Sequence, residues 1–113
     1  MPTQATPSID VQTETATGRG WRYGVVVTRD GEASDHTVTL CHQDHDFWCG
    51  GAWPPSRLVE RLLALVLDHL GDADAPGTLP TAFDCTTARR WLPGLDDLLR
   101  HASARGGAML PGV

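Results

Sequence analysis

The sequence predicts an α+β domain in which an N-terminal β-hairpin packs on one long helix, with two shorter C-terminal helices beside it. Two observations predict this class. Residues 21–42 alternate apolar and polar side chains around Asp30-Gly31, and residues 55–70 form a broad apolar arc at helical spacing. At 113 residues the chain has the length of one domain.

The hairpin is predicted from its strand period and its turn. Residues 21–27 and 36–42 each place apolar side chains at alternate positions. Asp30-Gly31 between them favours a tight turn, because glycine adopts a positive φ without a Cβ clash. A two-residue turn gives three facing pairs: Val25 with His36, Tyr23 with Val38, and Trp21 with Leu40. This register gathers the large apolar side chains on one face, which needs a helix or further strands against it.

The long helix is predicted from about Pro55 to Leu70. Proline is tolerated in the first turn of a helix, and Gly71 ends this one. The apolar arc is wider than one hairpin face requires, and Leu67 borders its polar stripe. We therefore expect burial on more than one side, against the hairpin and against either the last helix or a second copy of the chain.

Shorter helical segments complete the predicted fold. Residues 43–49 suit a helical turn that Gly50-Gly51 ends. Residues 85–92 form a short helix after Asp84, because aspartate is a residue type that caps helix N-termini. A final helix begins at Gly94 and carries an apolar stripe with the spacing of one helix face.

Both ends of the chain are rich in small and polar residues and lack an apolar period. We predict flexible tails at residues 1–18 and 104–113, flanking a single domain at residues 19–103. The N-terminal stretch lacks the apolar core of a signal peptide, and no apolar run is long enough to span a bilayer. The three cysteines are odd in number, which argues against a disulfide framework. A cytoplasmic protein without membrane contact is therefore expected.

The charge balance argues against nucleic-acid binding. Nine basic residues face fourteen acidic ones, the net charge is −5, and the basic residues form no run. Proteins that bind nucleic acid neutralise phosphates with clustered lysine and arginine. We expect a protein partner or self-association instead, the latter as a homodimer.

The densest group of chemically active side chains lies between Cys41 and Gly51. On a helical turn His42, His45 and Cys49 share one face, and thiolate with imidazole is a ligand set that zinc selects. The spacing differs from the familiar zinc patterns, which pair two cysteines with a distant second pair. The simpler interpretation is that the histidines cap a turn and the cysteines pack as small apolar residues. Zinc binding by Cys41, His42, His45 and Cys49 stays an alternative, and no other cofactor is expected.

A thiol-dependent enzyme is a second alternative from the same stretch. Cys49 or Cys41 would be the nucleophile, with His45 as base and Asp44 as the group that orients it. Nucleophile and base are usually brought together from distant segments, however, and here they are close in sequence. We therefore expect no enzymatic activity and assign no catalytic residue.

Tryptophans favour a binding role. Tryptophan is enriched at the residues that dominate protein interfaces. The alternative is that the tryptophans hold a small core together beside the prolines that flank them. The candidate interaction residues are Trp48, Trp53, Trp91 and Leu67.

Several short runs carry a family resemblance: Asp44–Trp48, Gly50-Gly51, Pro55 with the helix after it, Phe83-Asp84 and Arg90–Pro93. Over about residues 23–95 the chain resembles a group of small uncharacterised bacterial proteins. In that group a hairpin leads to an acidic-aromatic turn with a glycine pair, a leucine-rich helix and an "FD" segment that ends in arginine, two aromatics and proline. Its members carry Ser- and Tyr-like residues where this chain has Cys49 and His45. The resemblance implies a fold and no activity.

Together these observations predict a non-enzymatic protein-interaction or regulatory module of the bacterial cytoplasm. The reasons are small size, acidic charge, an over-wide apolar helix and many tryptophans without a convincing catalytic set.

Overall fold

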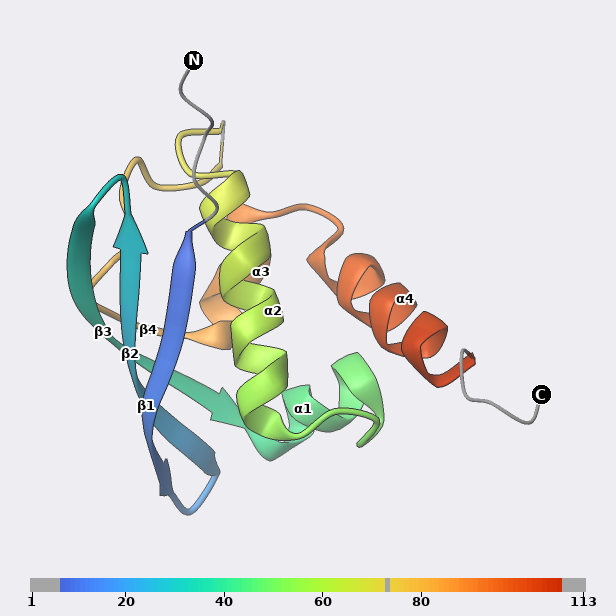
Figure 1. Ribbon diagram of the computed structural model, residues 1–113. Helices are drawn as coiled ribbons and strands as arrows, with labels where there is room; N and C mark the ends of the chain where they lie inside the picture. The colour runs from blue at the N-terminus through green and yellow to red at the C-terminus, as the bar shows by residue number, and fades with distance from the viewer. Residues whose placement is uncertain (1–6, 73, 109–113) are drawn as a thin grey trace.

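The structure, a computed structural model, describes residues 7–72 and 74–108 (Figure 1). Its elements in chain order are β1 (Ser8–Ala16), β2 (Gly20–Arg29), β3 (Glu32–Cys41), α1 (His42–Cys49), α2 (Pro55–Asp68), β4 (Ala82–Asp84), the 3-10 turn η1 (Cys85–Thr87), α3 (Ala88–Trp91) and α4 (Leu95–Ala108).

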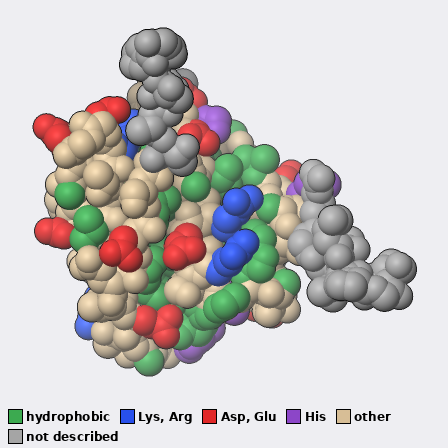
Figure 2. All heavy atoms as spheres, viewed as in Figure 1, with side chains coloured by type: hydrophobic (Ala, Val, Ile, Leu, Met, Phe, Trp, Pro, Cys, Tyr) green, Lys and Arg blue, Asp and Glu red, His purple; other side chains and the backbone are tan. Residues whose placement is uncertain are grey.

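The strands form one mixed sheet in the order β1-β2-β3-β4. The first three strands are antiparallel, and β4 pairs with β3 in parallel. The helices lie against one face of this sheet (Figure 1). In the same view, acidic side chains lie mainly over the sheet and hydrophobic ones beside α2 (Figure 2). The predicted α+β class is therefore confirmed, while the sheet is larger than the predicted hairpin.

The predicted hairpin is present as β2 and β3 with the expected register. Val25 faces His36, Tyr23 faces Val38, and Trp21 faces Leu40. The turn residues both have positive φ, 52° at Asp30 and 81° at Gly31. This is the geometry that matches the twist of the two strands, and it explains why the turn could be predicted from two residues.

The N-terminal tail was predicted too long, because residues 8–16 form β1. Ile9 and Val11 pack against the core from this strand, and the hydroxyl of buried Tyr23 donates a hydrogen bond of 2.8 Å to Glu14 Oε1. The strand was not predicted from the sequence, because only two large apolar residues lie on its inner face. Backbone pairing with β2 requires no particular side chain, which is why a polar segment can complete the sheet.

The C-terminal tail was also predicted too long. Helix α4 continues to Ala108, so residues 104–108 extend the helix that begins at Leu95. Residues 1–6 and 109–113, the remaining parts of the two predicted tails, lie outside the described residues.

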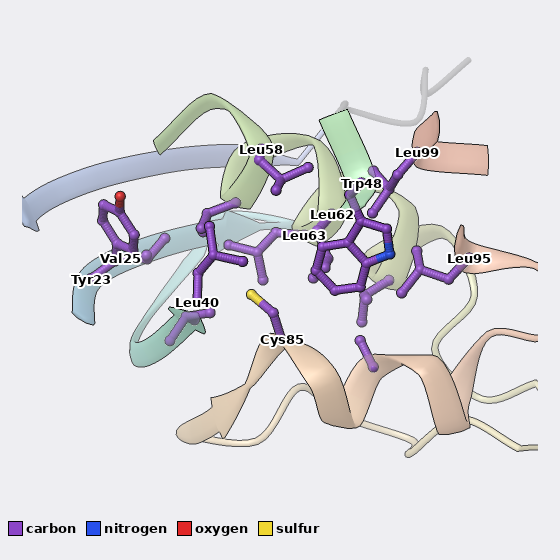
Figure 3. Close-up of a cluster of buried hydrophobic side chains, with 14 of the residues drawn as sticks. Tyr23, Val25, Leu40, Trp48, Leu58, Leu62, Leu63, Cys85, Leu95 and Leu99 are labelled. Carbon is purple, nitrogen blue, oxygen red and sulfur yellow. The ribbon is translucent and has the colours of Figure 1, made fainter. Parts of the chain in front are cut away.

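The core lies between the inner face of the sheet and the helices (Figure 3). Six residues of α2 are buried in it: Leu58, Val59, Leu62, Leu63, Val66 and Leu67. Trp48 from α1, Cys85 from η1 and two leucines from α4 lie on the other side of the same cluster (Figure 3). The wide apolar arc of α2 is thus covered within one copy of the chain.

None of the helices within residues 7–72 and 74–108 combines the length and the apolar character that crossing a membrane requires.

Replacing Leu62 by alanine tests the core. Leu62 is 0% exposed, so the substitution removes buried methyl groups and leaves a cavity. We expect the free energy of unfolding to fall by about 2–4 kcal/mol, as measured by urea denaturation. Leu98, which is 46% exposed, is the control, and its replacement by alanine should change stability by less than about 0.5 kcal/mol. An equally small effect at Leu62 contradicts the burial of α2.

Candidate interaction surfaces around helix α1

Helix α1 begins where β3 ends, and local sequence defines both of its ends. The Sγ atom of Cys41 accepts a hydrogen bond of 3.4 Å from the backbone N–H of Asp44 at the N-terminus. At the C-terminus Gly50 has φ of 58°, and its N–H donates to the carbonyl of Asp46. Such a left-handed residue favours glycine, so the Gly pair ends the helix here.

A partly buried ionic cluster joins α1 to the C-terminal helices. Arg89 of α3 places Nη2 3.0 Å from Oδ1 of Asp44, and its Nε donates a bond of 2.8 Å to Oδ1 of Asp96. The hydroxyl of Thr86 donates to the other oxygen of Asp44. The indole N–H of Trp48 donates to Oδ1 of Asp96 over 2.6 Å. We call these five residues the Arg89 cluster.

The contacts of the Arg89 cluster favour the charged forms of Arg89 and Asp96. Burial alone would lower the pKa of Arg89, but its hydrogen bonds to Asp96 and Asp44 outweigh that effect and raise it. Burial alone would raise the pKa of Asp96, but the hydrogen bonds from Trp48 and Arg89 lower it. Asp44 is 7% exposed, and Arg89 and Thr86 contact its two carboxylate oxygens within the protein.

Phe47 is the exposed neighbour of this cluster. Its side chain is 44% exposed, and two guanidinium groups lie near its ring. The Cζ atom of Arg100 is 4.8 Å from the ring centroid and that of Arg89 is 5.7 Å away. We call Phe47, Arg89 and Arg100 the Phe47 surface. It borders a groove of about 600 Å³ whose lining includes Gln43, Asp46 and Asp96.

Sequence analysis did not name Phe47 as an interaction residue, although helical spacing indicates that it faces solvent. Neighbouring residues on a helix point about 100° apart, so Phe47 and Trp48 cannot both face the core. Trp48 is 0% exposed, and its indole reaches toward α4 (Figure 3). Phe47 shares its face with Gln43, four residues earlier, and that polar partner marks the solvent side.

The four candidate interaction residues have different environments. The structure corrects the prediction for Trp48 and Leu67, because both are buried in the chain's own core, with 0% and 5% of their surface exposed. Trp53 and Trp91 remain partly exposed. The ring of Trp91 packs on Phe83, with 5.1 Å between the centroids.

The structure does not bring the residues of the zinc alternative together as ligands. His42 and His45 pack edge-on against Trp21, with centroid separations of 4.7 and 5.3 Å. Nε2 of His45 also bonds the carbonyl of Trp53 at 2.7 Å, and the thiol of Cys49 donates to the carbonyl of His45. Within the described residues no three His, Cys, Asp or Glu side chains are placed to hold a metal ion.

A thiol-dependent enzyme would need a thiol hydrogen-bonded to an imidazole, and the described part of the chain contains no such pair. Cys49 and Cys85 are buried, and burial raises the pKa of Cys85 well above its ordinary value. Cys41 is partly exposed and lines the groove, but its recorded hydrogen bond comes from a backbone N–H. A base positioned to activate a thiol is therefore missing from these contacts.

Comparison of the chain with protein-family models, with curated proteins and with solved structures gives no match.

The Arg89 cluster predicts a loss of stability in acid. Because the folded pKa of Asp96 lies below the ordinary value of 3.8, this carboxylate stabilises the fold above that pH. The contribution is lost as the pH falls through the folded pKa. We expect the melting temperature of the native chain to fall more steeply below about pH 4 than that of Asp96→Asn. Asp97→Asn, at an exposed neighbour, is the control and should keep the native steepness; equal curves for all three chains contradict the assignment.

Cysteine exposure predicts an order of alkylation. Cys41 should react with iodoacetamide first at neutral pH, since it is the partly exposed thiol, whereas buried Cys49 and Cys85 should react only as the protein opens. Peptide mass spectrometry over time measures all three rates, and Cys41→Ser should remove the fast phase. Modification of Cys85 as fast as Cys41 in the folded protein is the result that contradicts this burial.

Proposed function

We propose that this chain is a non-enzymatic protein-interaction module of the bacterial cytoplasm and that the Phe47 surface binds its partner. One observation carries the proposal: an exposed aromatic ring has two arginine guanidinium groups 4.8 and 5.7 Å from its centroid, and it lies on a helix that Arg89 joins to α3 and α4. Aromatic residues and arginine dominate the energetics of protein interfaces. A rigid surface also loses less conformational entropy when it binds, which supports this use.

The chemistry of the surface indicates what the partner presents. Arg89 already bridges two carboxylates, so it contributes little net charge. Arg100 forms no ion pair with the described side chains, so a partner carboxylate can pair with it. An apolar side chain of the partner would cover the ring of Phe47. Gln43 and Asp46 in the groove beside it offer hydrogen bonds to the partner's backbone.

The proposal requires no catalytic group. The histidines and thiols of α1, which suggested zinc or thiol chemistry, take part in packing and capping contacts within the chain. These contacts give each group a structural reason to be present.

Phe47→Ala tests the proposed surface. The wild-type chain, carrying a purification tag, should retain a stoichiometric partner from a lysate of the source cells under reducing conditions. Phe47→Ala should lower the captured amount by about tenfold or more, because truncating a central interface aromatic costs about 2 kcal/mol or more.

Leu98→Ala is the matched control for this experiment. Leu98 is 46% exposed, about as much as Phe47, and lies on another part of the surface beside Trp91 and Pro93. It should leave capture unchanged. Equal capture by the wild-type chain and Phe47→Ala, or equal loss in both variants, contradicts the proposal. The chain has no lysine, so a carbodiimide that joins its carboxylates to partner lysines suits the confirming cross-link.

A further inference from the structure

A second surface lies at the N-terminal end of α2. The guanidinium groups of Arg57 and Arg61 lie over the partly exposed ring of Trp53, with Cζ 5.9 and 6.0 Å from its centroid. The carbonyl of Trp53 is bonded at 2.7 Å by the ring of His45, which in turn packs on Trp21. The backbone at Trp53 is thus attached to α1, and through His45 and Trp21 to the sheet. We call Trp53, Arg57 and Arg61 the Trp53 surface.

The positive charge of the Trp53 surface is not neutralised within the described side chains. Glu60 lies between the two arginines in sequence, yet no ion pair within 4.0 Å joins it or any other described carboxylate to Arg57 or Arg61. Basic side chains lie beside hydrophobic surface over α2 (Figure 2). All nine basic residues of the chain are arginine, whose planar group pairs with carboxylates while it stacks on an aromatic ring.

Carboxylates gather at the opposite end of α2. The hairpin turn carries Asp30 and Glu32, and the C-terminal end of α2 with the loop after it carries Asp68 and Asp72. The two segments lie at the same end of the molecule, because Leu67 borders one groove with residues of the turn. Acidic residues outnumber Arg29 and His69 at that end, whereas the Trp53 surface carries two arginines, so charge favours an acidic partner at the Trp53 surface.

We infer that the Trp53 surface binds an acidic, extended segment of a second protein, separately from the Phe47 surface. Charge complementarity selects the occupant. Arg57 and Arg61 are one helical turn apart, about 6 Å along the axis. Alternate side chains of an extended segment point to one side about 7 Å apart, so Asp or Glu at every second position reaches both arginines.

The test uses fluorescence anisotropy with the full chain and a labelled Glu-Ser repeat peptide of about sixteen residues. The wild-type chain should bind it, and a Gln-Ser repeat peptide should not bind. The double variant Arg57→Gln/Arg61→Gln should weaken binding by about tenfold, since two charge pairs are lost. Raising the salt concentration should weaken wild-type binding as well.

Arg29→Gln/Arg90→Gln is the matched control. It removes the same net charge from two exposed arginines elsewhere and should leave the affinity unchanged. Arg57→Lys/Arg61→Lys keeps the charge but loses the planar group that stacks on Trp53, so it should weaken binding less than the glutamine variant does. If the double glutamine variant fails to fold, the single variant Arg61→Gln should still weaken binding, and unchanged affinity in it contradicts the inference.

Four results would overturn the inference. The first is that the acidic peptide does not bind, and the second is that both glutamine variants lose the same amount of peptide affinity. The third is that the wild-type chain binds single-stranded oligothymidylate as tightly as the acidic peptide. The fourth is that the mass of the wild-type chain in solution rises with its concentration and that Arg57→Gln/Arg61→Gln abolishes this rise. The third result would show that the Trp53 surface binds polyanions in general. The fourth would show that it binds a second copy of the chain.

Discussion

The position of α1 depends on one interaction, the bridge that Arg89 makes between Asp44 and Asp96. It joins α1 to α3 and α4, which are far from α1 in sequence, and Trp48 and Thr86 donate further hydrogen bonds to the two carboxylates. No buried side-chain nitrogen or oxygen among the described residues lacks a partner. A fully satisfied polar group of this kind specifies one arrangement, whereas a partly satisfied one would destabilise the fold. The orientation of Phe47 follows from it.

Sequence could predict the parts of the fold that are encoded locally. The hairpin register followed from a two-residue turn, and α2 followed from an apolar arc that begins at a proline. Strand β1 could not be predicted in this way. Its pairing with β2 rests on backbone hydrogen bonds, and residues 8–16 alternate polar side chains around two apolar ones. Residues 8–16 become a strand because β2 pairs with them, and not because of their own side-chain pattern.

The candidate site was harder to predict for the same physical reason. Asp44 has the position of an ordinary first-turn acid, and nothing nearby in sequence indicates that Arg89 neutralises it. Trp48 was chosen by residue type, but its ring is buried in the core and its indole N–H donates to Asp96. The exposed neighbour Phe47 became the surface residue instead. Residue types directed attention to α1, but only long-range contacts decide which side of it faces solvent.

Hydrogen exchange of the α1 amides in Arg89→Met tests the central claim most directly. Methionine keeps the apolar stem and removes the charge, which leaves Asp44 buried without its partner. We expect the amides of Phe47 and Trp48 to lose much of their protection while β2 and β3 keep theirs, because the cluster fixes α1 and not the sheet. Unchanged exchange in α1, or an equal loss across the sheet, would contradict the claim that Arg89 holds this helix in place.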